Sequence, residues 1–93
     1  MVDHQEAYRV NLVEEVGKLC RAVKGAPGKR NREATLAALR TNMTELVRVC
    51  TEGKHRALTT LKEKHETFPV DNALVTTEIL SEVAIAADAV LKA

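Results

Sequence analysis

The feature that most constrains this chain is its C-terminal segment, which reads VDNALVTTEILSEVAIAADAVLKA from residue 70 to residue 93. When the segment is placed on a helix at 100° per residue, its apolar side chains spread over about half of the circumference. One neighbouring helix cannot cover so wide an apolar arc. We therefore expect this helix to pack against two or more partners, or against another protein.

Two apolar positions interrupt the polar face of the same helix. Leu74 and Ile85 lie among acidic and hydroxyl side chains, so we expect Ile85 to be exposed, whereas Val83 and Val90 lie at the centre of the apolar arc. The candidate partner-binding residues of this helix are Leu74, Val75, Ile79, Val83, Ile85 and Val90.

The length of 93 residues is near the lower limit for a self-sufficient core, so association with a partner is a reasonable expectation. Apolar residues make up 45% of the chain, with one tyrosine, one phenylalanine and no tryptophan, so the core must be aliphatic. We expect a single α-helical domain over residues 1–93.

No apolar run approaches the roughly 20 residues that span a bilayer, and the first residues lack the charged-then-apolar layout of a signal peptide. No membrane span is expected, and the sequence favours a cytoplasmic protein, with the nucleus as the alternative. Cys20 and Cys50 stand among apolar helical neighbours and not in a metal-binding or redox spacing. Both are expected to be buried free thiols.

Helical periodicity predicts three helices, and no segment alternates as a strand would. Gly25 is suited to cap the end of the first helix, Phe68-Pro69 stops the second, and Asp71 or Asn72 caps the third. The predicted elements are a helix over about residues 3–24, a basic loop over 25–30, a helix over about 32–67 and a helix over about 71–92.

The second helix is predicted to continue through Gly53, because its apolar stripe keeps one phase on both sides and a mid-helix glycine costs only about 1 kcal/mol. Such a helix, on the order of 54 Å long, would carry the two shorter helices end to end along its length. The wide apolar arc of the C-terminal helix would then stay uncovered within one chain. Two antiparallel copies would cover it and close a four-helix bundle at each end.

The predicted fold is therefore all-α, a three-helix arrangement with one long central helix that forms a homodimer. In this dimer Cys50 would lie near the two-fold axis. Two alternatives stay open at this point. One is a compact three- or four-helix bundle in which the second helix breaks at Gly53, and the other is a heteromeric complex in which a different subunit covers the C-terminal helix.

The net charge of +1 gives no overall preference for nucleic acid or an anionic membrane. The distribution is uneven, because the stretch from residue 18 to residue 32 carries six cations and no acid. No aromatic residue accompanies them, so any nucleic-acid binding there would be nonspecific and salt-sensitive. The candidate anion-binding residues are Lys18, Arg21, Lys24, Lys29, Arg30 and Arg32.

No set of residues in the sequence forms a catalytic constellation or a cofactor motif, so we expect no catalytic residues, no cofactor and no enzyme. The three histidines, His4, His55 and His65, lack the spacing of metal ligands, and no metal site is expected. His65 lies on the apolar stripe and fits an interface position better.

Two functions follow from these surfaces. The first is a non-enzymatic helical protein–protein interaction module, a small scaffold or adaptor subunit that acts as a homodimer or within a larger complex. The alternative is a nonspecific nucleic-acid or anionic-surface binder that uses the basic residues between 18 and 32. Salt separates the two, because phosphate binding weakens steeply with ionic strength and apolar helix packing does not.

Overall fold

The computed structural model describes residues 4–25, 28–53 and 58–92 of the chain. Over these residues the chain is mostly helical and contains no strand, so the predicted all-α fold is confirmed. The elements are α1 (His4–Gly25), α2 (Lys29–Glu52), α3 (Leu58–Glu66), a single 3₁₀ turn η1 (Asn72–Leu74) and α4 (Thr77–Lys92).

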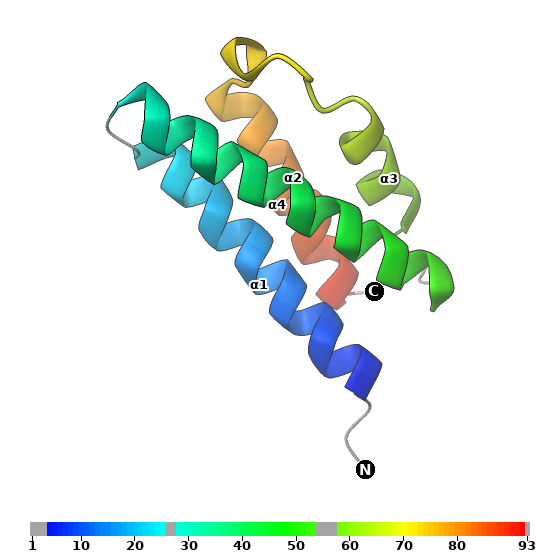
Figure 1. The fold of residues 1–93 in the computed structure, drawn as a ribbon. Coiled ribbons are helices and arrows are strands. Elements are labelled where there is room, and N and C mark those ends of the chain that lie inside the picture. Colours follow the sequence, from blue (N-terminus) through cyan, green and yellow to red (C-terminus); the bar gives the residue numbers. More distant parts are fainter. Residues whose placement is uncertain (1–3, 26–27, 54–57, 93) are drawn as a thin grey trace.

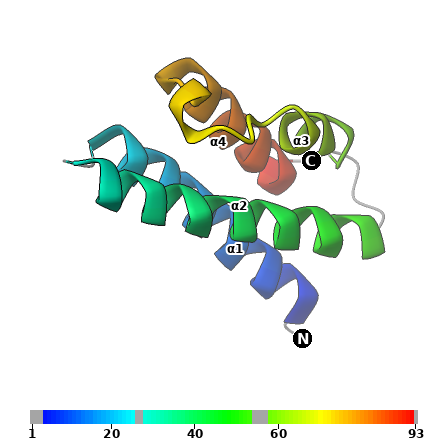
Figure 2. The same ribbon diagram turned by 45° about the horizontal axis from the view of Figure 1, so that its top comes forward.

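Four helices surround one core, and each runs antiparallel to the one before it (Figure 1). α1 packs against α2 and α4, and α3 packs against the same two helices, so α1 and α3 lie at opposite corners of the bundle. The bundle is elongated, with principal extents of 44 × 23 × 18 Å. Because α3 is short, residues 67–76 connect its end to the start of α4, and the 3₁₀ turn η1 is the helical part of this connection (Figure 2).

The prediction of one helix over 32–67 is wrong, because α2 ends at Glu52 and α3 begins at Leu58. The backbone N–H of Gly53 closes α2 with a hydrogen bond to the carbonyl of Val49 at 3.0 Å. The fold-back lets α3 pack against α2 and α4, where Leu61 is fully buried. Burial of this leucine side chain stabilises the folded-back arrangement. The structure is the compact four-helix alternative with its break at Gly53.

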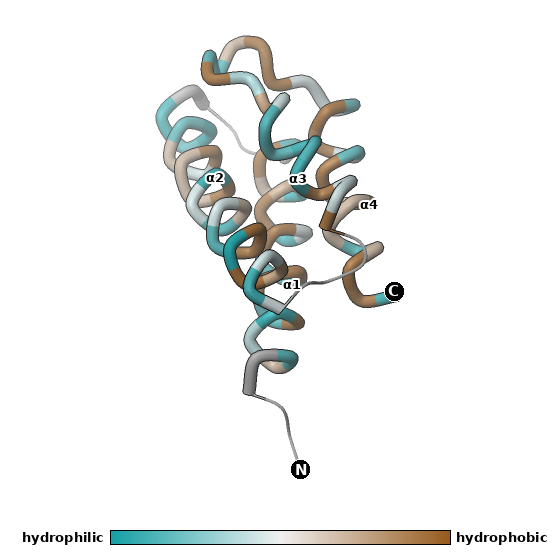
Figure 3. Tube along the Cα trace, turned by 90° about the vertical axis from the view of Figure 1, so that its right-hand side faces the viewer, coloured by the Kyte–Doolittle hydropathy of each residue, from teal (hydrophilic) through white to brown (hydrophobic). Residues whose placement is uncertain are grey.

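The wide apolar arc of α4 is covered within the chain, contrary to the expectation that it would stay open. α1 packs on one side of α4 and α3 on the other, which is the pair of neighbours that the width of the arc requires. Figure 3 shows that the trace of α4 is hydrophobic over much of its length. The buried residues of α4 are Leu80, Val83, Ala86, Ala87 and Val90.

The core is aliphatic, as the composition predicted. Its fully buried large side chains are leucine, valine, methionine and cysteine, among them Leu36, Leu39 and Met43 of α2. Ile85 is 69% exposed, so its predicted position on the outer face of α4 is confirmed.

Leu61 is the only buried residue of the nine-residue α3. We expect Leu61→Ala to lower the free energy of unfolding by about 2–5 kcal/mol, because it removes a buried leucine side chain and leaves a cavity. The neighbouring change Thr60→Ala, at an exposed position, should shift it by less than about 0.5 kcal/mol. Urea unfolding followed by circular dichroism measures both, and equal small effects would mean that α3 does not contribute to the core.

Candidate functional site

The chain between α3 and α4 has a defined irregular conformation. α3 stops before Phe68-Pro69, as predicted, and the carboxylate of Asp71 accepts a hydrogen bond from the N–H of Ala73 at 2.9 Å. Asp71 is therefore a cap, as predicted, but it caps the 3₁₀ turn η1 and not the last helix. The prediction that the last helix starts at about residue 71 is wrong. α4 starts at Thr77, where the hydroxyl of Thr76 accepts from the N–H of Ile79 at 3.2 Å.

Two arginines of α2 hold this segment by its backbone. Arg32 donates to the carbonyl of Asn72 at 3.0 Å through Nη1 and to that of Val75 at 2.7 Å through Nη2. These bonds fix the turn before α4 against the first turns of α2. Val75, between η1 and α4, is extended and buried, which explains why the helix does not begin earlier.

Arg40, two turns further along α2, holds the first part of the segment. Its guanidinium donates to the carbonyl of Pro69 at 2.8 Å, to that of Val70 at 3.3 Å and to the side-chain oxygen of Asn72. The same group lies over the ring of Phe68, 5.3 Å from the centroid, a cation–π contact. We call residues 68–75 the arginine-held segment.

The arginine-held segment presents two aliphatic side chains to solvent. Val70 is 95% exposed and Leu74 is 62% exposed, although their neighbour Val75 is buried. The hydropathy trace is hydrophobic on both sides of the turn (Figure 3). An ordered backbone that carries exposed aliphatic residues is a preorganised contact surface, because binding does not have to order it.

Two hollows flank Val70. One, of about 220 Å³, lies between α2, α3 and the segment and is lined by Met43, Thr44, His65 and Phe68 among others. His65 Nε2 lies 3.0 Å from the hydroxyl of Thr44, which itself donates to a backbone carbonyl of α2, so the histidine is the donor. The other, of about 480 Å³, is lined by Arg32, Glu33 and residues 70–73.

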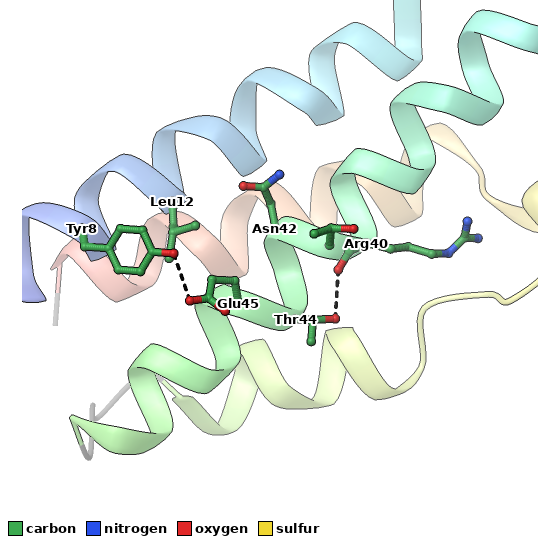
Figure 4. A pocket seen from close by; sticks show the side chains of 7 residues that line it. Tyr8, Leu12, Arg40, Asn42, Thr44 and Glu45 are labelled. Carbon is green, nitrogen blue, oxygen red and sulfur yellow. Dashed lines mark hydrogen bonds between the residues drawn. The ribbon is translucent and has the colours of Figure 1, made fainter.

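A larger hollow of about 620 Å³ lies across α1 and α2 (Figure 4). In it the hydroxyl of Tyr8 donates to Glu45 Oε1 at 2.9 Å, and Arg48 forms an ion pair with the same carboxylate. Arg48 first and Tyr8 second hold the pKa of Glu45 at about 2. The guanidinium of Arg40 points away from this hollow toward the arginine-held segment.

The polar groups of the larger hollow are engaged in structural bonds. The hydroxyls of Thr41 and Thr44 donate to carbonyls one turn earlier, at 3.1 and 2.9 Å. The hydroxyl of Tyr8 bonds to the carboxylate of Glu45, and the lowered pKa of Glu45 makes that carboxylate a weak base.

The six predicted anion-binding residues do not form one solvated set. Lys18, Arg21, Lys24 and Arg30 are exposed, and Lys24 also donates to the hydroxyl of Ser81 on α4 at 2.7 Å. Arg32, a predicted anion-binding residue, is instead turned inward and donates to two carbonyls of the arginine-held segment. The side chain of Lys29 lies outside the described residues.

The six predicted partner-binding residues are divided by the bundle. Val75, Val83 and Val90 belong to the core of the chain itself, so they offer no surface in this fold. Ile79 is half-buried, and Leu74 and Ile85 are exposed. Sequence reasoning missed Val70, the most exposed aliphatic residue of the segment.

The described part of the chain holds no group of three or more histidine, cysteine or acidic side chains placed to bind a metal ion. The side chain of His4 and the whole of His55 lie outside that part. None of its helices is both long enough and apolar enough to cross a bilayer.

Comparison with protein-family models, with curated proteins and with solved structures finds no match to this chain.

Both cysteines are free and buried, as predicted. Burial raises the pKa of Cys20 to about 11 and also raises the pKa of Cys50. The position proposed for Cys50 near a two-fold axis depended on a continuous helix, and α2 instead ends two residues later.

We expect Arg40→Ala to lower the free energy of unfolding by about 1–3 kcal/mol, because several charge-assisted hydrogen bonds are lost. Amide exchange of Leu74 and Val75, whose N–H groups bond within the turn, should speed up. Arg40→Lys should rescue only part of the loss, since an ammonium cannot reproduce the planar fork. Arg30→Ala, at an exposed cation, is the control, and an equal effect of both alanine variants would contradict this role of Arg40.

The thiols should resist alkylation in the folded protein. At neutral pH the raised pKa leaves little thiolate, and burial keeps reagents away. Iodoacetamide followed by mass spectrometry should find both cysteines unmodified under native conditions and modified in denaturant. Rapid native labelling of Cys20 would contradict its place in the core.

Proposed function

We propose that this chain is a non-enzymatic protein–protein interaction module, a small scaffold or adaptor subunit, and that it binds its partner through the arginine-held segment. The observation that carries the proposal is the exposure of Val70 (95%) and Leu74 (62%) on a backbone that two arginines fix. The two free cysteines fit a reducing compartment, so we propose that the protein is cytoplasmic, with the nucleus as the alternative.

The chemistry of the segment supports a protein partner. Aliphatic side chains beside shallow hollows bind other apolar side chains and carry no specificity for phosphate or sugar. Val70 lines both hollows, so a partner that covers it also reaches the half-buried His65 and Phe68 on one side and Asn72 on the other. Fixing the segment in advance reduces the entropy that binding costs.

The alternative function, anion binding through residues 18–32, draws on fewer cations than the sequence suggested. Lys18, Arg21, Lys24 and Arg30 remain exposed, but Lys24 also bonds to Ser81, and Arg32 serves the segment. We therefore prefer the apolar surface as the binding site.

The test compares affinity capture from native extract by the wild-type chain and by the variant Val70→Ser/Leu74→Ser. Both positions are exposed, so the melting temperature should stay nearly unchanged. The wild-type chain should retain partner proteins at moderate salt. The variant should retain at least about tenfold less of the same proteins, because the apolar contact is lost.

Leu91→Ser, at another exposed leucine, is the matched control and should retain the same proteins as the wild type. Two results would contradict the proposal. One is equal capture by all three chains, and the other is retention of nucleic acid alone, released by salt, which would favour the anion-binding alternative.

A further inference from the structure

A second surface, separate from the arginine-held segment, lies on the outer side of α1 and α4, which pack side by side. Each helix carries charges of both signs on this side, and the exposed side chain of Ile85 lies among those of α4. We call it the α1/α4 face. It consists of Glu14, Lys18 and Arg21 of α1 and Ile85, Asp88 and Lys92 of α4, all of them exposed.

The bond from Lys24 to Ser81 relates positions on α1 to positions on α4. The two helices run in opposite directions (Figure 1), and each rises 1.5 Å per residue. Lys18 is therefore at the height of Ala87, within one residue of Asp88. In the same way, Glu14 is at the height of Leu91, within one residue of Lys92. At these two heights α1 and α4 carry opposite charges.

These charges have no ion-pair partner in the part of the chain that the structure describes. No charged side chain of this face forms a hydrogen bond or an ion pair with another described residue. These side chains are Glu14, Lys18, Arg21, Asp88 and Lys92. These side chains are exposed to solvent and lie at equal heights on two separate helices. They are therefore suited to form ion pairs with another protein surface.

We propose that the α1/α4 face binds a second copy of this chain about a two-fold axis parallel to the helices. Such an axis keeps every residue at its own height and places α1 of one copy over α4 of the other. Lys18 then faces Asp88 of the second copy, and Glu14 faces Lys92. Each contact occurs twice, and every facing pair has opposite charge.

Ile85 occupies the apolar centre of this arrangement. Its height matches that of residue 20 on α1, between the exposed residues Lys18 and Ala22. The isoleucine can pack on the methyl of Ala22 and the aliphatic stem of Lys18 of the second copy while the ammonium reaches Asp88. The interface is rich in exposed ion pairs, so the dimer is weak and salt-dependent.

Charge exchange tests the proposal by sedimentation equilibrium of the full chain. We expect the wild type to self-associate at about 20 mM salt and to dissociate, with Kd rising about tenfold or more, at about 0.5 M. Lys18→Glu alone and Asp88→Lys alone should each be monomeric, because like charges then face each other twice. An equimolar mixture of these two single variants should form a heterodimer, since both facing pairs regain opposite charge.

The mixture also distinguishes the dimer from a contact within one chain, which mixing could not restore. Lys62→Glu on α3 is the matched control and should associate like the wild type, because it lies at an exposed position away from this face. A wild type that is monomeric at every salt concentration, or single variants that do not associate when mixed, would overturn the proposal. Neither result bears on partner binding by Val70 and Leu74.

Discussion

The structure depends on the end of α2 at Glu52 and Gly53. Because the chain turns back there, Leu61 reaches the core, and α4 acquires α3 as the second neighbour that its wide apolar arc requires. A continuous helix would leave that arc open and make a partner necessary for folding. With the turn, the core closes within one chain, and the exposed aliphatic residues that remain are available for other contacts.

The turn also creates the site. α3 is too short to run the length of α2, so the chain must cover the remaining distance as an irregular segment with backbone carbonyls that need donors. Arg32 and Arg40 supply those donors from α2. The same anchoring that satisfies the backbone fixes Val70 and Leu74 in place, so one set of bonds serves both the stability of the fold and the proposed contact surface.

Sequence periodicity predicted the elements whose physics is local. Gly25 ends α1, Phe68-Pro69 ends α3, and the buried and exposed faces of α4 follow the 3.6-residue period. The break at Gly53 was only the alternative, because two helices that line one core keep the same apolar phase as one helix does. The arginines were missed for another reason, since their carbonyl partners lie about 30 to 40 residues away, although a signal was present. Arg32 and Arg40 stand four residues on either side of the buried Leu36, so they flank the core-facing stripe.

The most direct test of the turn is the distance between α2 and α3 within one chain. Spin labels at the exposed positions Thr41 and Glu66, with Cys20 and Cys50 replaced by alanine, would report it by pulsed electron resonance after dilution with unlabelled chain. Since His65 contacts Thr44 at 3.0 Å, the labels should lie within roughly 20 Å of each other. A distance near 37 Å, as roughly 1.5 Å per residue gives for an unbroken helix, would contradict the account.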